Sequence, residues 1–499
     1  MIPTPTRMVL IIVDGLRRDV FLRALEGGEL PHVARIVGGN HGDRACHVEA
    51  VSTAPSITFT AQASLITGQH PGAHGIPGNE SFDRFGRISD GRPRHFGFDV
   101  GDTLAADDAV AVFASGLASR FLRPETPTLF EIVGAHGLRS AVFYYMYARG
   151  ADFWQPPNVL DIARFTKGRG VLGLEAGAYD AGMLRHVVRR LDGGERPDVL
   201  LAYFMGLDHH SHLHGTGSQP DYLRDVLDPQ IGQLLDALAR YGMVENTLFI
   251  LASDHGQVDA VADDRHSLRL GFPFDIELIH IFNALGLDVH DKPGEDPNCD
   301  AVMGLNGGLA HVYLQNRARR WADPPDYVKD VLPVAEAFHR MNTEGRYAEE
   351  LHDTLELILI RNVERDGWRA NYDAYLGDER TQPLADHLAQ HPELVYVDPV
   401  NRLHLAASEV SGDLLLVARG RDGYYFGAPI HGVHGGLLPG ESDPVLTFAL
   451  PGGQPEAVAR LRATISGIVS DRCAQENGRC PSVADMVPAA LAVMDIPSR

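Results

Sequence analysis

The sequence predicts an α/β fold, in which a mostly parallel sheet is sandwiched by helices, with an inserted α+β cap region. Two observations predict the sheet. Continuous apolar runs rich in β-branched and aromatic residues recur along the chain, and segments with helical periodicity separate them. This alternation is typical of parallel strands that are covered by helices on both faces. A third observation predicts the cap, because the alternation is interrupted from about Phe274 to Val410.

The expected strands of the sheet are short apolar runs that end at turns or polar residues. They are Met8–Val13, Ser140–Tyr145, Val199–Met205, Thr247–Ser253 and Pro444–Leu450. The expected helices have apolar residues three or four positions apart, and they include Tyr179–Leu191, Tyr222–Tyr241 and Glu456–Val469. We assign residues 1–273 and 411–499 to the core and residues 274–410 to the cap, and we expect the parallel sheet to resume with Asp413–Ala418.

Composition restricts the partners of the chain. The 499 residues are 44% hydrophobic and 22% charged, as in ordinary globular proteins. The net charge of −22 argues against binding a nucleic-acid polymer, although bound cations can make a cleft attractive to a small phosphorylated substrate. The apolar run Met8–Val13 is too short for a signal peptide or a membrane span. We therefore expect a soluble protein, cytoplasmic unless a removed leader directed it to the periplasm or outside the cell, and the sequence leaves a homo-oligomer open.

Candidate metal ligands follow three of the expected strands. Asp14, Asp208 and the Asp254-His255 pair each follow an apolar run, and the carboxyl ends of parallel strands meet at one edge of a sheet. His212 follows Asp208 by four residues, and His434 lies in a glycine-rich loop.

Carboxylates and imidazoles in this number suit two divalent ions, with zinc preferred and manganese or another metal as a substitute. Within the run HHSHLH we favour His212 as the ligand and expect His209, His210 and His214 to face neighbouring groups or solvent.

Six segments together resemble the alkaline phosphatase superfamily, and most closely its type I phosphodiesterase and nucleotide pyrophosphatase branch. They occur in the expected order over nearly the whole chain. The segments are VDGLR (13–17), TFTAQASLITG (58–68), HPGAHGIPGN (70–79), MGLDHHSH (205–212), SDHG (253–256) and VHGG (433–436).

The resemblance implies roles for individual residues. It implies two zinc sites, one held by Asp208, His212 and His434 and the other held by Asp14, Asp254, His255 and the oxygen of Thr58. Thr58 stands at the nucleophile position, ahead of a helix expected over residues 59–67, and Thr60 is the second choice. Asn79 matches a residue that hydrogen-bonds a phosphate oxygen, and Phe59 matches a position that stacks on a nucleobase.

The resemblance leaves the ester class open. The diesterase branch usually has Pro-Asn two residues after the nucleophile, where this chain has Thr60-Ala61. The segment 144–154 resembles the region in which threonine-type monoesterases carry Lys-x-Arg, with Tyr147 in place of the lysine and Arg149 retained.

Our first hypothesis is a phosphodiesterase or nucleotide pyrophosphatase that forms a phospho-threonine intermediate. The alternative is a phosphomonoesterase or phosphonate hydrolase in which Arg149 binds the substrate. An inactive metal-binding protein is disfavoured, because all seven positions of the metal site and nucleophile are filled.

Overall fold

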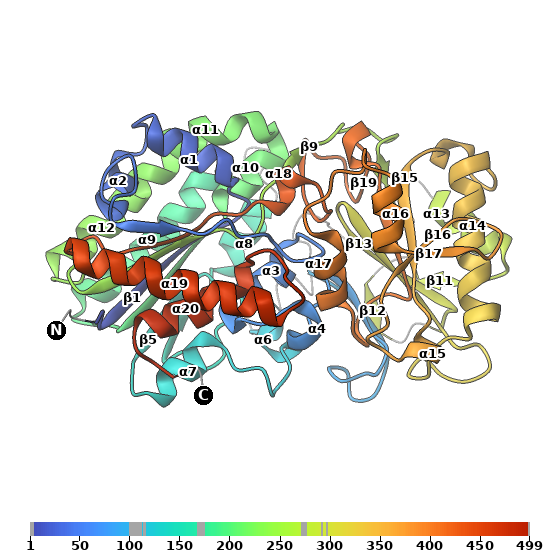
Figure 1. The fold of residues 1–499 in the computed structure, drawn as a ribbon, viewed down its shortest axis with the longest axis horizontal. Helices are drawn as coiled ribbons and strands as arrows, with labels where there is room; N and C mark the ends of the chain where they lie inside the picture. Colours follow the sequence, from blue (N-terminus) through green and yellow to red (C-terminus); the bar gives the residue numbers. More distant parts are fainter. Residues whose placement is uncertain are drawn as a thin grey trace.

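The computed structural model describes residues 4–98, 112, 116–166, 175–270, 277–290, 293–295 and 298–497. The chain forms two units that lie side by side, and both ends of the chain lie in the first unit (Figure 1). Each unit is built around its own seven-stranded sheet.

In the first sheet, five neighbouring strands that extend from the centre to one edge run parallel. Its strands are, in spatial order, β2 (Ala45–His47), β21 (Leu446–Ala449), β8 (Thr247–Ala252), β1 (Arg7–Val13), β7 (Val199–Phe204), β5 (Ser140–Phe143) and β6 (Phe153–Gln155). The strands from β8 to β6 run parallel, and β21 is antiparallel to β8. The predicted mostly parallel sheet is therefore confirmed.

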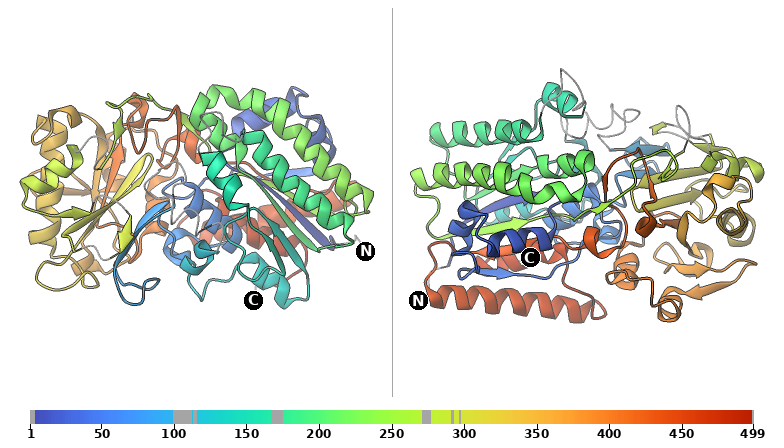
Figure 2. Two further views of the ribbon diagram at one scale, coloured as in Figure 1. Left: turned by 180° about the vertical axis from the view of Figure 1, so that it is seen from behind. Right: turned by 90° about the horizontal axis from the view of Figure 1, so that it is seen from above.

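Helices cover both faces of this sheet (Figure 2). On one face lie α1 (Arg18–Glu26), α2 (Pro31–Val37), α9 (Ala176–Asp192) and α12 (Asp228–Arg240), and on the other lie α7 (Leu129–Ala135), α19 (Pro455–Gln475) and α20 (Met486–Val493). Because both faces are covered, every residue of β7 and β8 is buried, which explains their continuous apolar sequences.

Shorter helices lie in the connections. They are α3 (Thr58–Thr67), α4 (Pro71–His74), α6 (Leu117–Phe121), α8 (Val159–Thr166), α10 (Gly206–His214), α11 (Gln219–Tyr222) and α18 (Pro439–Ser442). The single helix predicted over Tyr222–Tyr241 begins earlier, at α11, and passes through a π-helical segment (Leu223–Leu227) before α12.

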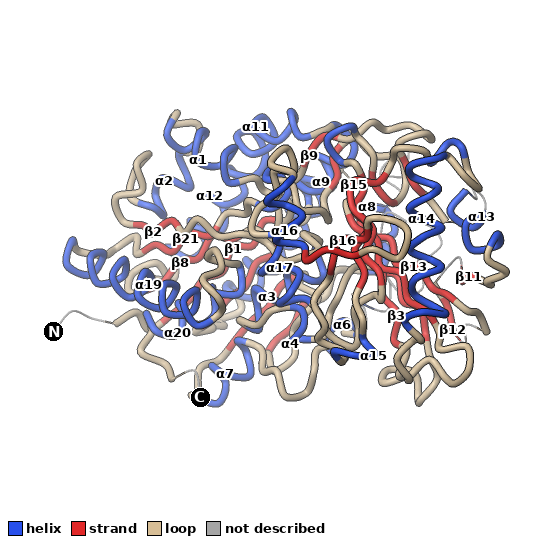
Figure 3. The backbone as a smooth tube through the Cα atoms, turned by 45° about the vertical axis from the view of Figure 1, so that its right-hand side comes forward, coloured by secondary structure: helices blue, strands red, loops and turns tan. Residues whose placement is uncertain are grey.

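The second sheet is mostly antiparallel. Its strands are, in spatial order, β11 (Val289–His290), β13 (Ala301–Asn306), β14 (Leu309–Leu314), β18 (Leu414–Ala418), β15 (Leu355–Ile360), β16 (Asp373–Tyr375) and β17 (Thr381–Pro383). One face packs on α13 (Glu277–Ala284) and α14 (Leu332–Glu344), and the other packs on α16 (Leu384–Gln390) and α17 (Pro399–Ala406) (Figure 3). The short helix α15 (Val363–Asp366) follows β15.

Strand β18 corrects the expected boundary of the cap. We expected Asp413–Ala418 to resume the parallel sheet, but this strand lies in the middle of the second sheet, antiparallel to β14 and β15. Leu414 and Leu416 pack in the cluster with α14, whereas Leu415 and Val417 pack in the cluster with α17. Burial on both faces produces a continuous apolar run whether neighbouring strands are parallel or antiparallel, so the run alone could not distinguish the two sheets.

Three small sheets complete the fold of the described residues. They are β3 (Glu80–Asp83) with β4 (Arg94–Gly97) and β12 (Gly294–Glu295), β10 (Ser267–Leu268) with β19 (Tyr425–Phe426), and β9 (Val258–Asp259) with β20 (Gly432–Val433). The pairing of β10 with β19 closes the inserted segment, so we propose that the insertion extends to β19; its expected start at Phe274 lies outside the described residues. Among the helices of the described chain, none is long and apolar enough to cross a membrane.

Candidate active site

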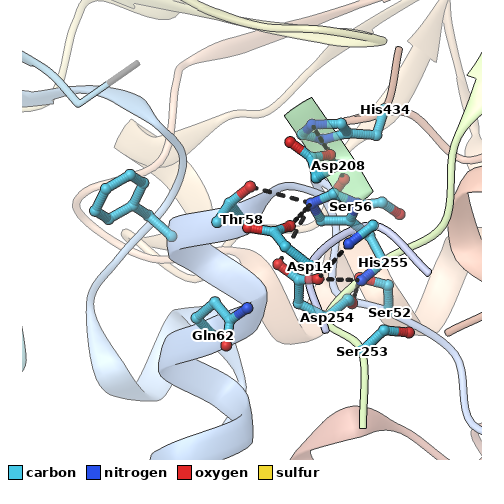
Figure 4. A network of polar contacts seen from close by, with 12 residues as sticks. Asp14, Ser52, Ser56, Thr58, Gln62, Asp208, Ser253, Asp254, His255 and His434 are labelled. Atoms are coloured by element: carbon cyan, nitrogen blue, oxygen red, sulfur yellow. Dashed lines mark hydrogen bonds and ion pairs between the residues drawn. The ribbon is translucent and has the colours of Figure 1, made fainter. Parts of the chain in front are cut away.

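The candidate site lies where β1, β7 and β8 end, next to the first turn of α3. Asp14 follows β1 directly, Asp208 lies in α10 after β7, and Asp254 and His255 follow β8. Since these three strands are neighbours in the sheet, their polar ends converge. Figure 4 shows Thr58 at the start of α3, facing His255 and Asp14, with Asp208 and His434 adjacent.

The first cluster consists of Asp14, Asp254 and His255, which are at most 1% exposed. The Nε2 atom of His255 lies 3.4 Å from Asp14 Oδ1 and 3.4 Å from Asp254 Oδ2. Neither carboxylate oxygen accepts a hydrogen bond from the residues that the structure describes, although both are fully buried. Buried carboxylate oxygens without a donor are costly, so this cluster has the composition of a cation site.

The second cluster consists of Asp208, His212 and His434. Asp208 and His212 are four residues apart on α10, and His212 Nε2 lies 3.0 Å from Asp208 Oδ2. His434 Nε2 lies 3.6 Å from Asp208 Oδ1. The rings of His434 and His255 stack with their centroids 3.7 Å apart, so the two clusters are in direct contact.

Each of the three histidines directs the same ring nitrogen into the site. Their Nδ1 atoms lie beside backbone carbonyl oxygens: His212 with Gly432 (2.7 Å), His255 with Gly256 (2.9 Å) and His434 with Ser56 (3.2 Å). A carbonyl only accepts, so Nδ1 donates its hydrogen, and Nε2 is the nitrogen that faces the site. Metal-binding histidines are oriented in this way.

The electrostatics of the clusters also fit divalent cations. Burial, with repulsion from Asp254 and Asp208, raises the pKa of Asp14 well above its usual range. Burial also raises the pKa of Asp254, and it lowers the pKa of His434 well below its ordinary value, so that this imidazole is neutral. A cation would remove the repulsion between the carboxylates. Two groups bring their ligand atoms within 4.8 Å of one another, Asp14-Asp254-His255 and Asp208-His255-His434.

Thr58, the predicted nucleophile, is the first residue of α3 and remains partly exposed. Its Oγ1 lies 3.1 Å from His255 Nε2. Thr60, the second choice, is fully buried, and its hydroxyl has no hydrogen-bond partner in the described part of the chain. The structure therefore brings Thr58, and not Thr60, to the candidate metal ligands.

The side chain of Asn79 contacts the first turn of α3. Its Oδ1 accepts a hydrogen bond from the backbone N–H of Phe59 (3.0 Å), which leaves the Nδ2 group as the donor for another oxygen. Phe59, predicted to stack on a nucleobase, is only 3% exposed. Its ring packs against Phe98 and Tyr147 in the core of the first unit, so these contacts do not support stacking on a nucleobase, which stays a prediction.

Arg149 is bound to groups that are not candidate site residues. Its guanidinium makes an ion pair with Glu131, with Nε 3.0 Å from Oε2, and donates to the carbonyl oxygens of Leu122, Arg123 and Thr126. These contacts hold the guanidinium within the protein and do not support the role of Arg149 as a substrate ligand, which stays a prediction. The match to a Lys-x-Arg motif could not reveal the carboxylate and carbonyl groups contributed by other segments.

The remaining histidines of the run pack against neighbouring rings. His210 contacts His214 and Tyr222 (ring centroids 4.5 and 4.8 Å), and His209 contacts Phe165 (4.2 Å). Their positions on α10 turn them away from the Asp208–His212 face, as expected from the helical spacing.

Two residues that the sequence did not single out support the carboxylates. The hydroxyl of Tyr203, on β7, donates to Asp14 Oδ2, and Nε2 of Gln257 donates to Asp208 Oδ1. Such partners orient metal-binding carboxylates. Gln257 directly follows the SDHG segment, but Tyr203 is one of several aromatic residues in a buried strand and has no distinguishing sequence signal.

The fold and the site together place the chain among enzymes that hydrolyse phosphate esters. The model of the type I phosphodiesterase / nucleotide pyrophosphatase family matches residues 8–435, and the chain belongs to this family.

Solved structures of similar fold include ectonucleotide pyrophosphatase / phosphodiesterase 5 from mouse and human. The murine structure has a TM-score of 0.56 and 13% sequence identity, with 99% of this chain and 96% of that chain covered. The human structure has a TM-score of 0.52 and 13% identity, with 99% and 100% covered. An inactive variant of the murine protein is in complex with AMP, and its TM-score is 0.57.

Curated relatives match over shorter segments. The catalytic subunit of GPI ethanolamine phosphate transferase 3 from Mus musculus is 34% identical over 109 residues, which cover 21% of this chain and 9% of the relative. GPI ethanolamine phosphate transferase 2 from Candida glabrata is 24% identical over 265 residues, which cover 52% of this chain and 26% of the relative. The matches thus span about a quarter or less of these relatives.

Proposed function

We propose that the chain cleaves phosphodiester or nucleotide pyrophosphate bonds at a two-zinc site through a phospho-threonine intermediate. One observation carries the proposal: the Thr58 hydroxyl lies 3.1 Å from His255 Nε2, next to two buried carboxylate oxygens, Asp14 Oδ1 and Asp254 Oδ2, that accept no hydrogen bond from the described residues. A threonine hydroxyl is a weak nucleophile unless its surroundings favour loss of its proton.

The residues that would hold the ions are the two clusters. Asp14, Asp254 and His255 form one set with Thr58, and Asp208, His212 and His434 form the other. Bound zinc, or manganese in its place, would supply a Lewis acid that lowers the pKa of the nucleophile and stabilises a leaving oxygen.

Side chains and backbone groups of the chain would bind the phosphoryl group and carry out the displacement at phosphorus. The Thr58 Oγ would attack phosphorus, forming an O–P bond as the bond to the leaving oxygen breaks, and water would later break the new bond. The amino end of α3 presents a positive dipole toward the phosphoryl group. The Nδ2 group of Asn79 would donate to a non-bridging oxygen, where negative charge increases in the transition state.

The contacts around Arg149 favour diesters over monoesters. A monoester carries more negative charge than a diester, so a monoesterase needs additional cationic groups at its site. Arg149 is bound by Glu131, and the hydroxyl of Tyr147 donates to the backbone oxygen of Phe59 (2.9 Å). The complex of the related murine protein with AMP supports a nucleotide as one substrate to test.

A substrate panel tests the proposal. Hydrolysis of bis(p-nitrophenyl) phosphate, p-nitrophenyl phosphate, ATP, a phosphonate and a phosphoethanolamine diester should be compared at equal zinc. The diester or the pyrophosphate should be fastest, and chelation should abolish activity until about two equivalents of zinc or manganese are restored. A monoester or phosphonate as the best substrate would favour the alternative, and full activity without metal would overturn the proposal.

A matched pair of variants tests the nucleophile. Thr58→Ala should lower kcat by at least about a thousandfold, since the attacking oxygen is removed. Thr60→Ala removes a hydroxyl from the same helix that has no partner, so it should retain near wild-type kcat.

A further inference from the structure

A buried asparagine of the inserted sheet connects the two units at the catalytic groups. Asn306 is the last residue of β13, and only Gly307 and Gly308 separate it from β14. Its side chain is 0% exposed, and its Oδ1 accepts from the backbone N–H groups of Asn79 (2.7 Å) and Glu80 (3.1 Å).

The other polar group of Asn306 is also fully used. Its Nδ2 donates to the backbone oxygens of Glu80 and Gly304, both at 3.1 Å. An asparagine amide has two acceptor positions and two donor hydrogens, so all four are satisfied here. This pattern requires an amide, because a carboxylate lacks the donors and an apolar side chain lacks both.

The same turn contacts the loop that carries His434. The backbone N–H of Gly308 donates to the backbone oxygen of His434 (3.1 Å). The contact is too close for side chains: a Cβ on Gly307 would lie 1.7 Å from the oxygen of His434, and one on Gly435 would lie 1.9 Å from the oxygen of Asn306. Gly307 also has a φ of +65°, which disfavours other residues.

The turn therefore touches the Asn79 segment through a side chain and the His434 loop through its backbone. The side chain of Asn79 in turn accepts from Phe59, directly after Thr58. A continuous path of hydrogen bonds thus runs from the inserted sheet to the amino end of α3.

We propose that Asn306 is a positioning residue, which fixes Asn79 relative to Thr58 so that the Asn79 amide meets the phosphoryl oxygen. The inserted unit is then part of the catalytic machinery. This inference rests on the proposed function, in which Asn79 donates to the substrate. Asn306 acts through Asn79 and contacts no reacting atom.

A double-mutant cycle on the full-length, zinc-loaded protein tests the inference, with a diester as substrate. Asn306→Ala should lower kcat about 10- to 100-fold with little change in KM, since only a transition-state contact is misplaced. In the Asn79→Ala background the same substitution should change kcat less than about threefold, because the group that it positions is gone. Metal content should stay at the wild-type value, because a backbone amide, and not this side chain, holds His434.

Two further variants separate positioning from stability. Asn306→Asp keeps the acceptor for Asn79 and Glu80, so its kcat should lie between those of the wild type and Asn306→Ala. If Asn306→Ala does not fold, Asn306→Asp takes its place in the double-mutant cycle. Asn316 is a matched control, since it is 9% exposed and its side chain hydrogen-bonds to the backbone of Pro324 and Ala318. Asn316→Ala should lower Tm without lowering kcat.

The outcomes distinguish the inference from the proposed function. Equal fold losses for Asn306→Ala with and without Asn79, or a loss matched by Asn316→Ala, would overturn the positioning role. If Asn79→Ala itself retains wild-type kcat, the proposed role of Asn79 fails, and the inference fails with it.

Discussion

The hydroxyl of Tyr203 offers a sharp test of the metal site, because it contacts a proposed ligand without being one. It donates to Oδ2 of Asp14, while Oδ1 of the same carboxylate has no donor. Burial raises the pKa of Asp14, and the hydrogen bond from Tyr203 opposes this rise. The tyrosine therefore favours the ionised carboxylate, which is the form that binds a metal.

Tyr203→Phe should weaken zinc binding at this cluster by about 2 kcal/mol, or about 30-fold. This value is typical of the loss of one hydrogen bond to a charged group. Zinc affinity should also fall more steeply as the pH is lowered, because the pKa of Asp14 is raised further and the proton competes more strongly. Competition with a chromophoric chelator, measured at several pH values, would give both quantities.

Tyr145→Phe is the matched control. Tyr145 is also fully buried, its ring centroid lies 5.4 Å from that of Tyr203, and its hydroxyl donates to the backbone oxygen of Gln62 (2.8 Å). Its loss should cost about 1 kcal/mol of folding stability and leave zinc affinity unchanged. Wild-type zinc affinity in Tyr203→Phe, or the same loss in both variants, would refute the reasoning.

Three further predictions follow from the placement of other residues. His212→Ala should lose most activity and about one equivalent of metal, whereas His210→Ala should have a mild effect because that ring packs on other rings. Assays of activity and metal content test this, and a larger loss in His210→Ala than in His212→Ala would contradict it. Arg149→Ala should lower Tm and slow monoester and diester hydrolysis by the same small factor, because Glu131 binds its guanidinium. A loss of activity toward the monoester alone would contradict this prediction. Phe59→Ala should destabilise the fold by about 3–5 kcal/mol in a denaturant titration, since the ring is part of the core, and an unchanged unfolding midpoint would contradict this.

Much of the fold and the convergence of the candidate ligands could be predicted from the sequence, because both depend on local patterns. The apolar runs of β1, β7 and β8 end directly before the residues that converge in space. The spacing of Asp208 and His212 fits one face of a helix whatever the surroundings.

Other features depend on contacts between distant segments. The apolar run of β18 shows that a strand is buried but not which sheet buries it. The environments of Phe59 and Arg149 are set by Phe98, Tyr147 and Glu131, and no local pattern predicts these contacts. Asn306 contacts residues more than 200 positions away, so these contacts are visible only in the structure.

Trapping the intermediate on Thr58 tests the central claim most directly. The zinc-loaded protein would be mixed with a diester, quenched in acid during turnover, digested, and analysed by mass spectrometry. The account predicts a substrate-derived phosphoryl adduct on Thr58, which is absent from Thr58→Ala and present in Thr60→Ala. An adduct on another residue, or wild-type turnover by Thr58→Ala, would contradict it.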